Sequence, residues 1–180
     1  MSALYVILAL VALQRIAEMF YAERNTRALR ARGAIEIAPE QHPFFISLHA
    51  GWLLAMALFV PPASVPNWYL VGFFFVLQAL RVWVLATLGP YWTTRIITLP
   101  DAPLIRGGPY RFMKHPNYTI VVLEIAVLPL AFGAVTIAAI FSVLNAALLT
   151  WRIRIENAAL AARRAPEPSA GRTTSDENVG

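Results

Sequence analysis

The sequence predicts an all-α, polytopic integral membrane protein with about five transmembrane helices. Of its 180 residues, 58% are hydrophobic and only 14% are charged, whereas soluble domains average roughly a quarter charged residues. Several apolar segments approach the roughly 20 residues that a helix needs to cross a bilayer. We place the spans at about 2–22, 43–62, 67–88, 116–132 and 134–151.

The first predicted span is interpreted as a membrane helix and not as a cleaved signal peptide. It lacks a basic start, and it carries Arg15 and Glu18 where a signal peptide would be uniformly apolar. A basic helical extension follows it and should end near Gly33. We expect a transmembrane domain over residues 1–164 and a disordered tail over 165–180, which is rich in Pro, Ser and Gly.

Tight connections join the later spans into two hairpins. The segment PPASVPN links the second and third spans, and a turn at Gly133 links the fourth and fifth. The fourth and fifth spans are short, and the fourth contains Pro129. We therefore expect the last hairpin to tilt or to fall short of the far leaflet.

The basic residues predict the orientation of the chain. Four Lys or Arg residues lie between the first and second spans, four between the third and fourth, and five after the fifth, while the other two connections have none. Because positive residues stay on the cytoplasmic side, the N-terminus should be outside and the C-terminus cytoplasmic. This placement explains the net charge of +5 better than a nucleic-acid partner does. The chain has no cysteine, which excludes disulfides and thiolate metal sites, and we expect no metal.

Each predicted span carries a polar side chain at a similar depth. At a rise of ~1.5 Å per residue, these side chains lie roughly 10–12 Å from the cytoplasmic boundary. Polar groups in lipid are costly and usually face the interior of a bundle, so we interpret them as lining a cavity for an acceptor. A purely structural role, as ion pairs or interhelical hydrogen bonds, is the alternative. Arg15, His49, Arg81, Glu124 and Asn145 lie at this depth, and Glu18 and Asn25 continue the polar stripe of Arg15 on the first helix. The candidate substrate-binding residues are Arg15, Glu18, Asn25, His49, Arg81 and Asn145.

Two polar clusters, Tyr110–Tyr118 and Arg152–Asn157, flank the last hairpin, which should bring them together at the cytoplasmic ends of the last two spans. Pro116 suits the first turn of a helix, so His115 and Asn117 lie at a helix N-terminus, where backbone donors and the dipole favour an anion. The alternative to a binding site is that these basic residues only flank membrane helices on the cytoplasmic side.

The second cluster contains a pair that can bind opposite charges. Arg152 and Glu156 are four residues apart on one helical face. The carboxylate could bind an ammonium group or ribose hydroxyls, and the guanidinium could bind a carboxylate.

Taken together, GGPYRFMKHPNY, Glu124 and the pair Arg152 and Glu156 resemble the isoprenylcysteine carboxyl methyltransferase family, which is related to the phospholipid N-methyltransferases. QRIAEMFYAERN, RGAIE, HPFFISLH and PYWTTRIITLP are similar to its YpbQ-like bacterial branch, and the resemblance covers nearly all of residues 10–162.

The resemblance implies S-adenosylmethionine as cofactor, a cofactor-binding core at about 105–162, and the inner membrane of a bacterium with the active site facing the cytoplasm. The candidate cofactor-binding residues are Tyr110, Arg111, His115, Pro116, Asn117, Tyr118, Arg152, Glu156 and Asn157. Family members often have two consecutive acids where this chain has Glu156 followed by Asn157, so donor binding would depend on Glu156 alone.

The predicted reaction is methyl transfer to an oxygen of a lipophilic acceptor dissolved in the membrane, either a hydroxyl, as in an alkylresorcinol or alkylpyrone, or an isoprenylcysteine-like carboxylate. A carboxylate needs only a cation to orient it, whereas a phenol or enol needs a base; the acid in span four favours the hydroxyl. The candidate catalytic residues are Arg152, Glu124 and Glu156, with His115 as a further possible base and Arg15 as a further cation.

Two other functions stay open at this point. One is an NADPH-dependent membrane reductase of the same wider superfamily. The other is a non-catalytic, lipid-binding membrane subunit. The sequence does not fix the oligomeric state.

Overall fold

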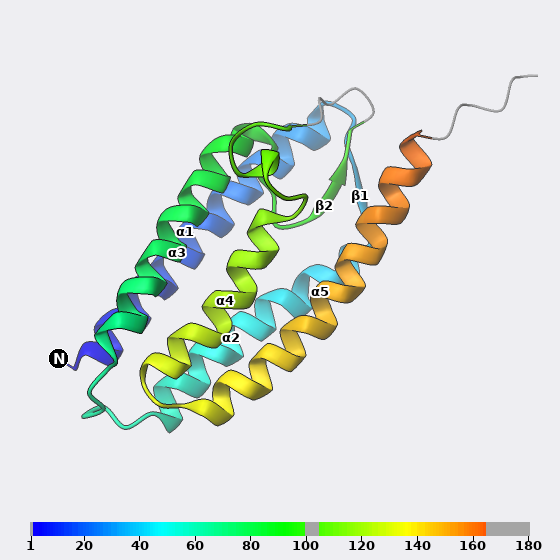
Figure 1. The fold of residues 1–180 in the computed structure, drawn as a ribbon. Helices are drawn as coiled ribbons and strands as arrows, with labels where there is room; N and C mark the ends of the chain where they lie inside the picture. Colours follow the sequence, from blue (N-terminus) through cyan, green and yellow to red (C-terminus); the bar gives the residue numbers. More distant parts are fainter. Residues whose placement is uncertain (1, 100–104, 165–180) are drawn as a thin grey trace, which may run out of the picture.

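The structure, a computed structural model, describes residues 2–99 and 105–164, so the predicted tail lies outside the described residues. Within the described part, five α-helices form a bundle with a small two-stranded sheet at one end (Figure 1). The helices are α1 (Ala3–Ala31), α2 (His42–Phe59), α3 (Trp68–Leu88), α4 (Pro116–Ala131) and α5 (Val135–Arg164). The strands are β1 (Ile35–Ile37) and β2 (Ile96–Thr98), and short 3-10 turns cover Pro39–Gln41, Gly89–Tyr91 and Gly108–Arg111.

The bundle has two distinct ends. The N-terminus and the α2–α3 and α4–α5 connections lie together at the lower left of Figure 1, and the strands and the segment that precedes α4 lie at the opposite end. The connections without Lys or Arg are thus at one end, and the basic loops are at the other. We call the second of these the basic end.

Four helical segments are long and apolar enough to cross a membrane. These are Ala3–Ala31, Pro39–Phe59, Trp68–Tyr91 and Val135–Ala159, while α4, at 16 residues, is a shorter apolar helix. The expectation that the fifth span is short is wrong, since α5 has 30 residues. Hydropathy predicts the end of a span where charged residues begin, but α1 and α5 both continue as helices past the charged residues.

The sheet departs from the all-α prediction. β1 and β2 pair antiparallel, with Ile35 opposite Thr98 and Ile37 opposite Ile96. The chain can turn from α1 into β1 because Gly33 adopts a φ of +87°, a left-handed conformation that glycine accepts without strain. This turn also confirms the predicted helix end near Gly33.

Ion pairs around Glu36 hold the strands to α1. Nη1 of Arg95 lies 2.8 Å from Oε1 of Glu36, and Arg30 pairs with the other carboxylate oxygen. Burial alone would raise the pKa of Glu36, but the hydrogen bonds and charges of Arg95 and Arg30 outweigh it and hold that pKa below its usual value.

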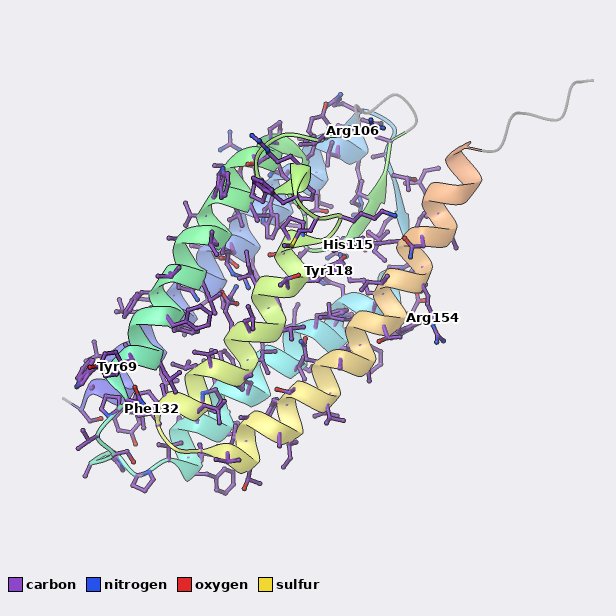
Figure 2. All side chains as sticks on the ribbon, in the orientation of Figure 1. Tyr69, Arg106, His115, Tyr118, Phe132 and Arg154 are labelled. Atoms are coloured by element: carbon purple, nitrogen blue, oxygen red, sulfur yellow. The ribbon has the colours of Figure 1, made fainter. Side chains whose placement is uncertain are left out.

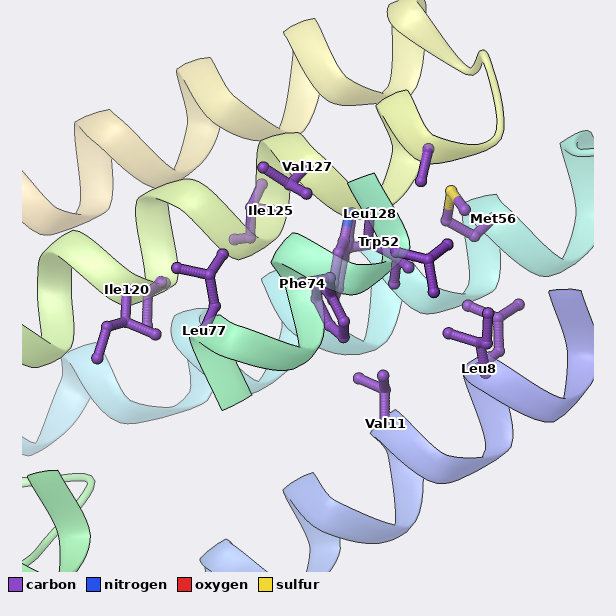
Figure 3. Close-up of a cluster of buried hydrophobic side chains, with 14 of the residues drawn as sticks. Leu8, Val11, Trp52, Met56, Phe74, Leu77, Ile120, Ile125, Val127 and Leu128 are labelled. Carbon is purple, nitrogen blue, oxygen red and sulfur yellow. The ribbon is translucent and has the colours of Figure 1, made fainter. Parts of the chain in front are cut away.

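The apolar core lies where α1, α2, α3 and α4 meet, as Figure 3 shows. Trp52, Phe74 and Leu128 are almost fully buried there. Asn67 fixes the start of α3, because its side-chain oxygen accepts hydrogen bonds from the backbone of Tyr69 and Leu70.

Candidate functional site

The α4–α5 hairpin brings the two polar clusters into contact. Tyr118 donates a hydrogen bond to Glu156 and accepts one of 2.8 Å from Nε of Arg152. Nδ1 of His115 lies 3.7 Å from Oε2 of Glu156, and the His115 ring stacks on the Tyr118 ring with 5.2 Å between centroids. Their proximity, predicted from the hairpin, is confirmed. We call His115, Tyr118, Arg152 and Glu156 the hairpin cluster.

Figure 2 shows where the hairpin cluster lies. His115 and Tyr118 are at the start of α4, whereas Arg154 is on the outer side of α5. Arg152 and Arg154 therefore differ sharply in environment although they are two residues apart: Arg152 is buried and Arg154 is exposed. Arg152 also lies over the ring of Phe45 in α2, with its guanidinium 5.3 Å from the ring centroid.

The turn before α4 sets the position of the cluster. Gly108 adopts a φ of +54°, and a Cβ at this position would collide with Thr87 of α3. Glycine thus allows the turn to pack directly on α3. Pro116 then begins α4, where its missing N–H leaves no hydrogen bond unmade.

The hairpin cluster lines a cavity of about 640 Å³. A volume of this order is typical of small-molecule and cofactor sites. All five helices and β2 contribute to its wall, so the site is wider than the two helix ends expected from the sequence. Most of the wall is apolar, and the predicted site residues that line it are Arg15, Glu18, His49, Arg81, Tyr110, His115, Asn117, Tyr118, Arg152 and Glu156.

A second set of charged residues forms a network at one side of this cavity, where Arg15, Glu18 and Arg81 reach the wall and Glu124 does not. Glu124 accepts hydrogen bonds from Arg81, from Nη2 of Arg15 at 2.8 Å and from Nε2 of Gln78 at 2.8 Å. Glu18 pairs with Arg15 at 2.8 Å. We call Arg15, Glu18, Arg81 and Glu124 the buried network; its two positive and two negative charges balance.

The buried network is joined to the start of α4. Nη1 of Arg81 donates a hydrogen bond of 3.3 Å to Oδ1 of Asn117, one residue before Tyr118. Arg81 and Glu124 are 2% and 1% exposed, so neither charge is solvated by water. Charges buried at this depth depend on each other for compensation.

The structure does not bring every candidate residue to the cavity. Glu124 is enclosed by its partners and does not line the wall, which removes the geometry expected of a base. Asn25 donates to the carbonyls of Gly89 and Trp92 and so holds α1 to the segment after α3. Asn145 is 1% exposed within the bundle. Arg111, Pro116, Asn145 and Asn157 also lie outside the wall.

Tyr110 also lines the wall of the cavity. Burial, and then the charge of Glu156, raises the pKa of Tyr110 to about 12, so this phenol is neutral at physiological pH.

Phe45 and the β2 segment were not anticipated as parts of the wall. The aromatic residues of HPFF could have indicated a ring at the wall, and the β-branched residues of TRIITL a short strand, but neither segment indicated that it faces the cavity. In the part of the chain that the structure describes, no group of His, Asp or Glu is arranged to hold a metal ion.

Comparisons with known proteins bear on this arrangement. The model of the isoprenylcysteine carboxyl methyltransferase (ICMT) family matches residues 70–162, which include the hairpin cluster, Arg81 and Glu124. The uncharacterized protein YpbQ of Bacillus subtilis is 36% identical over 160 residues, which cover 87% of this chain and 95% of that protein. No solved structure matches the chain significantly.

Proposed function

Because the chain belongs to the isoprenylcysteine carboxyl methyltransferase family, in its YpbQ-like branch, we propose that it transfers a methyl group from S-adenosylmethionine to an oxygen of a lipophilic acceptor. The observation that carries the proposal is the hairpin cluster on the wall of the cavity. It unites an acid, a guanidinium, an imidazole and a phenol from two helices at a site large enough for a nucleoside.

The groups of the cluster fit the chemistry of the donor. Arg152 can bind the amino-acid carboxylate through charge-assisted hydrogen bonds. Glu156 can accept hydrogen bonds from the ammonium group or from ribose hydroxyls.

When bound, the donor supplies an electrophilic methyl carbon, so the tasks left to the protein are alignment and electrostatics. Arg152 is held in place by Tyr118, Glu156 and the ring of Phe45. The buried network fixes the start of α4, and with it His115 and Tyr118, through Asn117. The apolar wall keeps water from the reacting atoms.

The proposed setting is the bacterial inner membrane, with the basic end of the bundle toward the cytoplasm and the N-terminus outside. Thirteen Lys and Arg residues outside the spans favour this orientation. The hairpin cluster is near the basic end (Figures 1 and 2). A water-soluble donor would therefore reach the cavity from the cytoplasm, while the acceptor would come from the bilayer.

The proposal is tested by incubating purified protein in lipid nanodiscs with S-adenosylmethionine that carries a tritiated methyl group, together with lipid extracts from bacterial membranes. We expect tritium in the lipid-soluble fraction, and none when Glu156→Gln replaces the natural protein. A parallel reaction follows NADPH oxidation. Oxidation of NADPH without methyl transfer would contradict the proposal and would favour a reductase.

A further inference from the structure

We infer that His49 is the general base of the proposed methyl transfer, and that the acceptor presents a neutral hydroxyl to it. The inference rests on the proposed function and adds a catalytic residue on α2, outside the hairpin cluster. Four observations lead to it: the hydrogen bonding of His49, the engagement of the other acids at the cavity, the charge balance of the buried network, and the position of His49 along α2.

The hydrogen bonding of His49 fixes which ring nitrogen is basic. Nδ1 lies 2.8 Å from the carbonyl oxygen of Phe45. A carbonyl only accepts hydrogen bonds, so Nδ1 carries the proton and Nε2 of the neutral ring carries a lone pair. Nε2 makes no hydrogen bond to any described residue, yet it is not sealed off, and the ring lines the cavity.

The carboxylates near the cavity already have partners. Glu18 is bound by Arg15 and by Gln14, at 2.8 and 3.0 Å. Glu156 is bound by Tyr118 and Arg152 in the hairpin cluster. An acid held by a cation is a weak base, because taking up a proton would break its ion pair.

Two other histidines line the cavity, and each is occupied differently. His115 stacks on Tyr118 and faces Glu156, so it belongs to the proposed donor site. Nε2 of His42 is hydrogen-bonded to the hydroxyl of Thr94 at 3.0 Å. Because a hydroxyl can donate or accept, this bond does not define which nitrogen of the ring carries the proton. The structure therefore leaves His49 with the best-defined free lone pair.

The buried network favours a neutral acceptor over a carboxylate. Its cations, Arg15 and Arg81, are both engaged by Glu18 and Glu124. A carboxylate beside this network would add a negative charge that the network, with two cations and two carboxylates, does not balance, which is costly away from water. A phenol or enol adds no charge, but it must lose a proton as it reacts, and that requirement calls for a base.

The position of His49 suits this task. It lies one helical turn beyond Phe45, or about 6 Å along α2, and the Phe45 ring supports Arg152 of the hairpin cluster. The hydroxyl can thus lie between the proposed donor site and Nε2. Apolar side chains continue the wall around His49 and suit a hydrocarbon chain; they include Ile16, Met19, Ile46 and Leu53.

The step balances in atoms and charge. The acceptor oxygen forms a bond to the methyl carbon, and the electron pair of the carbon–sulfur bond leaves with the sulfur. The hydroxyl proton moves to Nε2 of His49. The positive charge of the sulfonium therefore ends on the imidazolium of His49, and the methylated acceptor is neutral.

The test compares His49→Gln with His42→Gln, the same change seven residues earlier on α2. Two acceptors are used: pentadecylphenol and a nitro-substituted pentadecylphenol, whose more acidic hydroxyl ionises without help. We expect His49→Gln to bind S-adenosylmethionine normally by calorimetry and to lower kcat for pentadecylphenol about 100-fold or more. Turnover of the nitro compound should fall far less, whereas any loss in His42→Gln should be equal for the two acceptors.

A second readout needs no donor and no turnover. Nitrophenolate absorbs visible light, so its band reports proton transfer from the bound acceptor. At a pH below the pKa of the free nitro compound, where that compound is neutral in solution, the natural protein and His42→Gln should both raise the phenolate fraction of the bound compound, and His49→Gln should not.

The outcomes separate the inference from the proposed function. Equal loss with both acceptors, no loss with either, or an unchanged phenolate band in His49→Gln would overturn the role of His49. Methylation by the natural protein of pentadecanoic acid, but of neither phenol, would overturn the hydroxyl acceptor. Failure of the natural protein to bind S-adenosylmethionine would instead contradict the proposed function itself.

Discussion

Replacing Glu124 by glutamine should unbalance the buried network and destabilise the whole bundle. In the natural protein this carboxylate, 1% exposed, accepts hydrogen bonds from Arg81, Arg15 and Gln78. Glutamine has nearly the same shape but no charge. Two guanidiniums would then share Glu18 as their remaining partner within the network.

The size of the effect follows from what is lost. Removing one partner of a buried ion pair costs about 3–5 kcal/mol, chiefly because the other charge stays buried without compensation. For a chain of this length that corresponds to a fall in Tm of roughly 10 °C. Because Arg81 also holds Asn117 next to the hairpin cluster, the affinity for S-adenosylmethionine should fall as well.

The assay is thermal unfolding of detergent-purified protein, followed by circular dichroism. A double variant, Glu124→Gln with Arg15→Gln, serves as the matched control, since it restores a balance of one positive and one negative charge in Arg81 and Glu18. Its loss of stability should be smaller than the sum of the two single losses. A fall of less than about 1 kcal/mol for Glu124→Gln, or strict additivity in the double variant, would refute the reasoning.

Three further predictions concern the elements around the site. The pKa of Glu36 is lower in the folded protein than the unfolded value of about 4.3, so its ion pairs stabilise the fold above that value. This contribution, about 0.5–1 kcal/mol, is lost as the pH falls through the folded pKa. Thermal unfolding should therefore show a smaller fall in Tm between neutral and acidic pH for Glu36→Gln than for the natural protein. Gly108→Ala should cost about 1–3 kcal/mol because of its positive φ and the collision with Thr87, whereas Gly107→Ala should be tolerated, since nothing lies near its Cβ; equal melting temperatures of the two variants would contradict this. Asn67→Ala should remove the cap of α3 and cost about 1 kcal/mol in the same measurement, and an unchanged Tm would argue against the cap.

The pairing of helices into hairpins and the depth of polar residues along each helix could be predicted from the sequence, because both depend on segment length and helical rise. The contact of Tyr118 with Arg152 and Glu156 follows from two helices joined by a tight turn, although α5, at 30 residues, is much longer than α4, at 16. The contact of Arg15 with Glu124 joins residues placed at one depth from their distances to the span ends.

The direction in which a side chain points around its helix could not be obtained in the same way. Asn145 lies at the predicted depth and Asn25 continues the polar stripe of Arg15, yet neither lines the cavity. Which face of each helix meets its neighbours depends on packing between segments far apart in the sequence. The free nitrogen of His49 depends in turn on the hydrogen bond to Phe45, which only the folded helix reveals.

The segments outside the membrane spans were the hardest to anticipate. β1 and β2 are three residues each and pair across about sixty positions of the chain. Neither strand shows the alternation that marks a half-buried strand over a longer stretch. β2 reaches the wall of the cavity because it pairs with β1, which Glu36 joins to Arg30 of α1.

The most direct test of the account is calorimetric binding of S-adenosylmethionine, its demethylated product and NADPH to the natural protein and to Arg152→Ala and Arg154→Ala. The two arginines are neighbours on α5, one buried in the hairpin cluster and the other exposed. We predict that the natural protein and Arg154→Ala bind the first two compounds and not NADPH, and that Arg152→Ala binds the first two at least tenfold more weakly, about 1.4 kcal/mol. Equal binding by both variants, or binding of NADPH alone, would contradict the account.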